Sequence, residues 1–272
     1  TPADLVDPGP DGQSLPAGAI DVRFEGVCFA YPGGSEVLSD IDLVIPAGQR
    51  VAVVGETGSG KSTIAKLLTR LMDPTRGRVL LDGVDLLDIS EAALRSSVVL
   101  VPQEGFLFDD TLAANVRYGR LGATAAEIHE AADAIGLGDW LAGLPDGVET
   151  PVGQRGESLS AGERQLVALL RAQLADPDIL VLDEATSAVD PELETRIARA
   201  LERLMSGRTS VTIAHRLSTA EAADVVVVVD RGRIVQHGPH AELVQQPDTP
   251  YARLHASWVA QRGGGADRIM EP

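Results

Sequence analysis

A glycine-rich loop, Gly55–Ser62, is the feature of this sequence that most limits how the chain can fold. It reads G-x-x-x-x-G-K-S. The apolar stretch Arg50–Val54 precedes it and the amphipathic stretch Thr63–Leu71 follows it. A strand, a glycine turn and a helix in this order aim backbone N–H groups and the positive helix end at one point, which suits a polyphosphate. The sequence therefore predicts a nucleoside triphosphate site on an α/β sheet.

Each residue of this loop has an expected part in holding the triphosphate. Lys61 is expected to reach the β- and γ-phosphates, and the Ser62 hydroxyl is expected to ligate Mg²⁺. The predicted nucleotide contacts are Gly55, Glu56, Thr57, Gly58, Ser59, Gly60, Lys61, Ser62 and Thr63.

Composition excludes several other kinds of protein. The net charge of −17 argues against nucleic acid as a main partner, because phosphate-backbone binding needs a basic surface. The single cysteine, Cys28, excludes an intrachain disulfide and suits a reducing compartment. No apolar run approaches the ~18–20 residues of a membrane span, and no signal peptide pattern is present, so we expect a soluble domain.

The chain divides into three expected parts. Residues 1–19 are rich in Pro, Gly and Asp and are expected to be a linker, followed by one folded domain over 20–262. The glycine-rich tail 263–272 is expected to be disordered. Because the sequence starts at Thr1 rather than Met, we expect a domain excised from a longer chain.

Strand and helix patterns alternate through the domain, which predicts a mainly parallel sheet with right-handed crossovers. Residues 104–175 are mostly helical in pattern and are long enough to form a subdomain. The expected strands are 20–30, 43–45, 50–54, 79–81, 98–101, 179–182, 210–214 and 225–229, and the expected helices include 63–71, 125–135, 161–175, 191–205 and 217–222.

A second chemical motif follows a buried strand. Ile179–Leu182 is apolar and ends in Asp183 and Glu184. Side chains at the carboxyl end of a parallel strand face the ligand crevice. Asp183 is therefore expected to hold Mg²⁺, and Glu184 is expected to polarise the attacking water.

A third motif, Leu159–Gln165, reads LSAGERQ and resembles the LSGGQ signature of ABC transporter nucleotide-binding domains, a likeness that runs over residues 20–258. Ser160 and Glu163 have capping-box spacing, so a helix and a second anion-attracting helix end are expected here. The resemblance implies an α/β phosphate-loop ATPase core with an antiparallel β portion and an inserted helical subdomain. It also implies a head-to-tail dimer, with one chain's signature on its partner's ATP. The implied trans contacts are Ser160, Ala161, Gly162, Glu163 and Asp190.

Further positions match the family one by one. Tyr31 corresponds to the aromatic residue that stacks on adenine, and Gln103 corresponds to the glutamine that contacts Mg²⁺ or water. His215 follows a predicted strand and corresponds to the switch histidine near the γ-phosphate. The resemblance thus implies that Lys61, Gln103, Glu184 and His215 are catalytic, with Ser62, Gln103 and Asp183 serving Mg²⁺.

Three segments resemble the exporter branch of the family: Phe106–Phe108, Thr150–Gly156 and Arg231–Gly238. They imply ATP-driven export through a transmembrane domain, at the cytoplasmic face of the cell membrane, with a second nucleotide-binding domain as partner. Thr150–Gly156 corresponds to the loop that touches the coupling helices of the membrane domain. The transported substrate is chosen in membrane segments, which this sequence does not contain.

The signature and the coupling loop depart from the family patterns. Ala161 replaces a glycine and adds a methyl group close to where the partner's ATP is expected to dock, and Glu163 replaces a glutamine and places a carboxylate near a phosphate. We expect both changes to be tolerated, with weaker binding of the partner's ATP than the consensus signature gives. In the coupling loop, Pro151 and Gln154 replace two glutamates.

Three other functions stay open at this point: the ATPase of an importer, a soluble ATPase acting on ribosomes or DNA, and a nucleotide-binding module that no longer hydrolyses. The arginine in the coupling loop disfavours the first, and the acidic single domain disfavours the second. The presence of both Glu184 and His215 disfavours the third.

Overall fold

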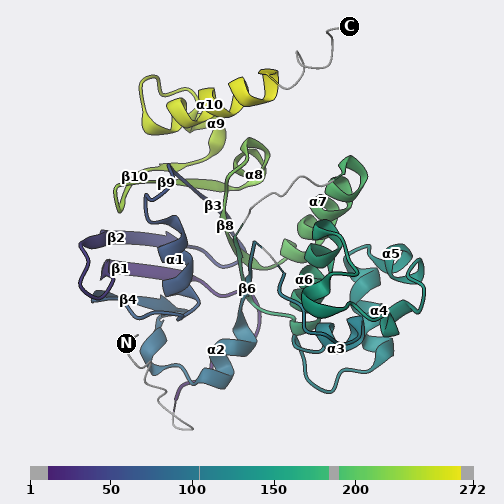
Figure 1. Cartoon of the computed structure of the whole chain (residues 1–272). Helices are drawn as coiled ribbons and strands as arrows, with labels where there is room; N and C mark the ends of the chain where they lie inside the picture. Colours follow the sequence, from purple (N-terminus) through teal and green to yellow (C-terminus); the bar gives the residue numbers. More distant parts are fainter. Residues whose placement is uncertain (1–11, 104, 184–189, 265–272) are drawn as a thin grey trace, which may run out of the picture. The chain divides into compact units, whose positions relative to one another are not determined.

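The computed structural model describes residues 12–103, 105–183 and 190–264. Its contacts divide the chain into two compact units, each of which is described by itself. The first unit combines residues 1–94 with residues 209–272, and the second unit contains residues 95–208. In Figure 1 the first unit therefore contains both the purple strands near the N-terminus and the yellow helices near the C-terminus.

An antiparallel sheet forms the N-terminal part of the first unit. Buried Val22 and Phe24 alternate with exposed Arg23, as expected for a strand with one face in the core. Val22 lies opposite Ile45 on one side and Leu81 on the other. This sheet is the expected antiparallel portion. In spatial order its strands are β2 (Glu36–Ile45), β1 (Val22–Ala30), β4 (Arg76–Leu81) and β5 (Val84–Asp85).

Parallel strands form the centre of the first unit. β3 runs parallel to β8 on one side and to β9 on the other, and β10 pairs antiparallel with β9. Ala52 and Val54 of β3 cluster with Ala220, Leu243 and Tyr251, so α8, α9 and α10 pack against this sheet. The bounds are β3 (Arg50–Val54), α1 (Lys61–Leu68), β8 (Thr209–Ile213), α8 (Leu217–Ala222), β9 (Val225–Asp230), β10 (Arg233–Gly238), α9 (His240–Leu243) and α10 (Pro250–Gly264).

The second unit is mostly helical (Figure 1). Its centre is α6, whose Leu166, Val167, Leu169 and Leu170 are fully buried among the surrounding helices. β6 and β7 form a parallel pair in the same unit. α2 (Glu91–Ser97) crosses the division between the units. The other bounds are β6 (Val98–Val101), α3 (Leu112–Val116), α4 (Ala125–Ala134), α5 (Gly138–Ala142), α6 (Ala161–Ala175), β7 (Ile179–Asp183) and α7 (Pro191–Met205), with one-turn helices η2 (Leu86–Asp88), η3 (Gly147–Glu149) and η4 (Gln154–Gly156).

Two edges of the expected domain differ in the structure. Gln13, in the expected linker, donates from its N–H to Asp88 O at 2.8 Å and accepts from Ser90 N–H at 3.1 Å. At the other end α10 continues to Gly264, two residues into the expected tail. The last residue of a helix can be predicted from sequence only to within one or two residues, because the last turn lacks full hydrogen bonding.

The last feature of the fold to consider is whether any helix could cross a membrane. Among the described residues, no helix has the length and apolarity of a bilayer span.

Candidate functional site

The glycine loop joins β3 to α1 in a conformation that only glycine adopts readily. Gly55, Gly58 and Gly60 have φ values of 153°, 82° and 111°. A Cβ at Gly60 would lie 2.6 Å from Leu38 Cδ2, so a side chain there would also collide with the antiparallel sheet. The loop is therefore specified both by its backbone and by close packing.

The N-terminus of α1 is open to a ligand. Its N-cap is Gly60, with no side-chain cap hydrogen bond and no acidic residue in the first turn. Ser59 Oγ is buried and has no hydrogen-bond partner in the part of the chain that the structure describes. A buried polar atom without a partner is costly, so this loop suits a bound polar group such as a phosphate.

Lys61 brings positive charge into the loop. The residue is only 5% exposed, and its Nζ donates to Gly55 O and to Glu56 O, both at 2.8 Å. The ammonium is thereby held beside the loop backbone rather than in solvent. Lys66, one turn further along α1, is exposed.

Two more predicted residues lie on the first unit. Tyr31 is 39% exposed and packs edge-on against Phe29, with ring centres 5.0 Å apart, so it is a surface ring rather than a core tyrosine. His215 is exposed and follows β8. Val53 pairs with Ile213, so Gly55 and His215 each come two residues after paired positions on neighbouring parallel strands. This register brings His215 to the same sheet edge as the glycine loop.

On the second unit, Gln103 and Asp183 share another strand edge. Val101 of β6 pairs with Leu182 of β7, so Asp183 lies one residue beyond this pair and Gln103 lies two residues beyond it. Asp183 is half-buried and Gln103 is exposed. The predicted base Glu184 lies outside the described residues.

The signature segment begins α6 with the capping box that its spacing predicts. Glu163 N–H donates to Ser160 Oγ at 3.2 Å, and Ser160 N–H donates to Glu163 Oε2 at 2.9 Å. Ser160 and Ala161 are exposed, and Gly162 is buried. Asp190 caps α7 in a similar way, since its Oδ1 accepts from Leu193 N–H at 3.0 Å.

An exposed aromatic patch, formed by Phe106, Phe108 and Tyr118, was found only in part from sequence. The ring centres of Phe108 and Tyr118 are 4.6 Å apart in a stacked arrangement, and Phe106 meets Phe108 edge-on. Arg171 Cζ lies 5.6 Å from the Tyr118 ring centre, and burial lowers the pKa of this arginine. The exporter-like stretch pointed to the two phenylalanines, but Tyr118 carried no local signal.

The coupling-loop segment lies beside the start of α3. Leu112 N–H donates to Thr150 O at 2.9 Å, and Val152 N–H donates to Asp110 O at 3.0 Å. The segments 106–112 and 150–156 therefore belong to one surface region of the second unit.

Comparison with known proteins gives consistent matches. A sequence model of the family described as ABC transporter matches residues 38–187. The chain is 48% identical over 251 residues to an ATP-dependent lipid A-core flippase of Chromobacterium violaceum, covering 92% of this chain and 43% of the flippase. It is 42% identical over 252 residues to an ATM1-type heavy metal exporter of Novosphingobium aromaticivorans, covering 93% of this chain and 41% of the exporter.

A solved structure agrees with this sequence likeness. A bacterial Atm1-family ABC exporter with ATP bound superposes with a TM-score of 0.85 at 42% identity, covering 93% of this chain and 44% of the exporter chain. The present chain thus spans less than half the length of these relatives.

Proposed function

This chain belongs to the ABC transporter family, and from that premise we propose that it binds and hydrolyses ATP to power export through a transmembrane partner. The observation that carries the proposal is the open N-terminus of α1, with its glycine loop, the buried Lys61 and the unpartnered Ser59 Oγ. These features fit a triphosphate, because they supply donors and positive charge without any competing carboxylate in the first turn.

The nucleotide contacts are assigned residue by residue. Lys61 and the loop amides would bind the β- and γ-phosphates, and the exposed Tyr31 ring would stack on the base. Ser62, Gln103 and Asp183 would hold Mg²⁺, which supplies charge neutralisation on the phosphate oxygens when bound.

Hydrolysis would require a base and a residue that orients the phosphate. We assign Glu184 to accept the proton of the attacking water, and His215 to fix the γ-phosphate and that water. The position of His215 at the same sheet edge as the glycine loop supports its part.

A second copy, or a similar chain, would complete each site. Ser160, Ala161, Gly162, Glu163 and Asp190 would contact the ATP held by the partner. The exposure of Ser160 and Ala161 supports this, because the start of α6 is open to a second surface rather than enclosed within its own unit.

The transmembrane partner would dock on the aromatic patch and the neighbouring coupling loop. Phe106, Phe108 and Tyr118 are 56%, 45% and 54% exposed, which is unusual for large aromatic side chains that stack on each other. Relatives more than twice as long as this chain support a partner domain outside these residues. The two kinds of relative, a lipid A-core flippase and a heavy metal exporter, favour a place for this domain at the cytoplasmic face of a membrane, where it would power export.

Substitution of the proposed base tests this function. Glu184→Gln should lower ATP turnover about a hundredfold or more, since a neutral amide cannot accept the proton, while MgATP binding is kept. The same variant with MgATP should sediment as a dimer. Glu202→Gln, an exposed change on α7, serves as the matched control with unchanged turnover. Full ATPase activity in Glu184→Gln would refute the assignment.

A further inference from the structure

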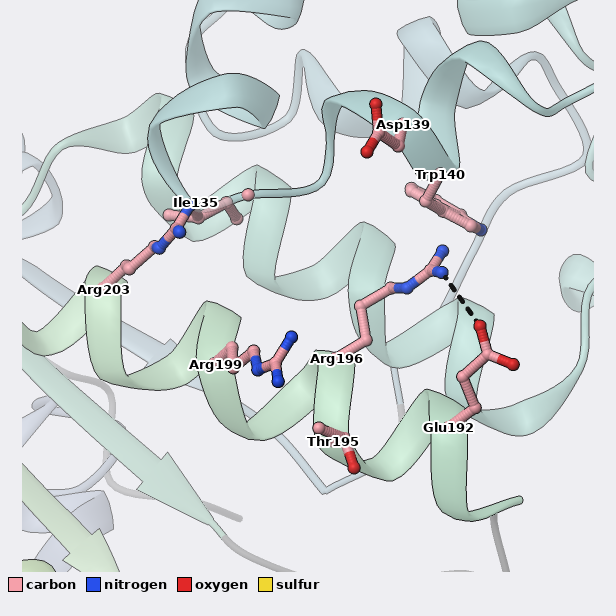
Figure 2. A pocket seen from close by; sticks show the side chains of 9 residues that line it. Ile135, Asp139, Trp140, Glu192, Thr195, Arg196, Arg199 and Arg203 are labelled. Carbon is pink, nitrogen blue, oxygen red and sulfur yellow. Dashed lines mark ion pairs between the residues drawn. The ribbon is translucent and has the colours of Figure 1, made fainter.

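A cavity of about 420 Å³ lies within the second unit, between α7 and the segment that joins α4 to α5. Figure 2 shows the side chains of Arg196, Arg199 and Arg203 rising from α7 toward Ile135 and Trp140. The volume falls in the range of sites that take small organic molecules. The predicted ATP-site residues are not among those that line it.

The three arginines share one face of α7 because their spacings of three and four residues follow the helical repeat. The adjacent stripe of the helix, Ile197 and Leu204, is buried in the core of the unit. Packing of that apolar stripe therefore fixes the direction in which the arginine stripe points. Arg199 and Arg203 are exposed, so the core fixes the face of α7 that carries them, and their side chains reach the cavity from that face.

Charge balance along this face is incomplete. Arg196 Nη2 lies 3.5 Å from Glu192 Oε1, but the Glu192 side chain is 86% exposed, so solvent weakens the pair. Neither Arg199 nor Arg203 makes an ion pair or side-chain hydrogen bond with another described residue. The helix dipole favours a cation at Arg203 in the last turn, but it offers nothing to Arg199 in the middle of α7. Unpaired arginines are notable in a chain of net charge −17.

The opposite wall is of a different kind. Ile135 and Trp140 are 2% and 8% exposed and form a fixed apolar surface. Asp139 is a carboxylate on the same side, at the start of α5. A ligand that is anionic throughout would meet this carboxylate unfavourably. The cavity instead suits a ligand with an anionic end toward α7 and an uncharged body toward Ile135 and Trp140.

We propose that this cavity binds a small organic phosphate, at a site separate from the glycine loop. Arg199 and Arg203 would bind the phosphoryl group. Each guanidinium can donate two parallel hydrogen bonds to phosphate oxygens, and the two positive charges would neutralise a phosphate dianion. The uncharged body would cover Ile135 and the edge of Trp140. Inorganic phosphate would bind more weakly, since it lacks that body. The proposal concerns binding alone and does not depend on ATP hydrolysis.

Trp140 supplies a direct readout, because it is one of two tryptophans and the other, Trp258, lies on α10 of the first unit. The Trp258→Phe protein is titrated with phenyl phosphate, with inorganic phosphate as a second arm and sodium chloride at matched ionic strength. We expect a saturable change in Trp140 fluorescence, with phenyl phosphate at least threefold tighter than inorganic phosphate. The change should persist when Lys61→Ala is added, which distinguishes the cavity from the glycine loop.

Arginine variants locate the site. Arg199→Gln with Arg203→Gln should weaken phenyl phosphate at least tenfold, whereas Arg199→Lys with Arg203→Lys, which keeps charge and loses the fork, should have an intermediate effect. Arg120→Gln is the matched control, since Arg120 pairs with Glu127 on the same unit and does not line the cavity. The lysine pair also tests the site if the glutamine pair does not fold.

Three results would overturn the proposal. One is the absence of any saturable signal with phenyl phosphate. Another is equal affinity in the parent protein and in the folded arginine variants. The third is loss of the signal in Lys61→Ala, which would assign the binding to the glycine loop.

Discussion

The starts of α1 and α6 are both suited to anions, yet they are built in opposite ways. α1 begins at Gly60, with no side-chain cap and no acidic residue in its first turn. α6 begins at Ser160, whose capping box with Glu163 satisfies backbone donors from within the chain. The first helix end leaves its donors to a ligand, whereas an external phosphate at the second must compete with a carboxylate.

Burial differs in the same sense. Ser59 and Lys61 are each 5% exposed, so these two side chains of the glycine loop are already enclosed within one unit. Ser160 and Ala161 are exposed, so the start of α6 becomes enclosed only when another surface covers it. The difference gives a physical reason for the proposed dimer, in which one chain would hold its own triphosphate and its capped helix would complete the site of another.

Removal of the loop ammonium should have the largest effect. Lys61→Ala should weaken MgATP binding about tenfold to a hundredfold, because charge-assisted hydrogen bonds to the phosphates are lost. Calorimetric titration measures the affinity, and Lys66→Ala on the exposed side of α1 should leave it unchanged. Equal MgATP affinities for the Lys61→Ala and Lys66→Ala variants would contradict the interpretation that the uncapped start of α1 binds the triphosphate.

Removal of the cap on α6 should separate the contribution of Ser160 to stability from its contribution to ATP-driven dimerisation. Ser160→Ala should cost about 1 kcal/mol of unfolding free energy, measured by denaturant titration. Thr124→Ala removes the equivalent cap of α4, another capping box on the same unit, and should cost a similar amount. In the Glu184→Gln background only Ser160→Ala should also weaken ATP-driven dimerisation. Equal dimerisation in both variants would mean that Ser160 acts only as a cap.

Neutralisation of the signature carboxylate should have the smallest effect. Glu163→Gln keeps an oxygen that accepts from Ser160 N–H, so the cap is retained, but it removes the negative charge from the place where the partner's phosphate would bind. Dimerisation with MgATP, measured by sedimentation, should strengthen by about threefold, consistent with loss of a helix-end charge effect. Glu127→Gln makes the same change in the α4 box and should not alter dimerisation. No gain for Glu163→Gln would show that its charge does not reach the nucleotide.

Local patterns predicted much of the fold. β6, α6, α7 and α8 have the bounds expected from sequence. α6 and α7 each begin after a capping side chain, Ser160 and Asp190, and β6 is a short apolar run. β2 was predicted only at 43–45, yet it spans Glu36–Ile45. Polar Glu36, Asp40 and Asp42 hide this strand from sequence, and its pairing with β1 from Ala30↔Glu36 to Val22↔Ile45 forms it.

The candidate site also has features that the sequence predicts and features that it does not. The glycine loop and the α6 capping box were predictable because each depends on residues within one turn of chain. The stacking of Tyr118 on Phe108 and the approach of Arg171 were not, since α6 brings that arginine from a distant part of the sequence.

The sequence by itself determined which segments can meet a phosphate and which helices cap themselves, because backbone donors, glycine φ values and capping spacings are local properties. Only the tertiary structure decided which donors are enclosed, which aromatic rings remain exposed, and that three arginines of α7 face Ile135 and Trp140 across a cavity. These outcomes depend on the burial of apolar stripes from segments far apart in the chain, and burial of that kind is set by packing rather than by neighbouring residues.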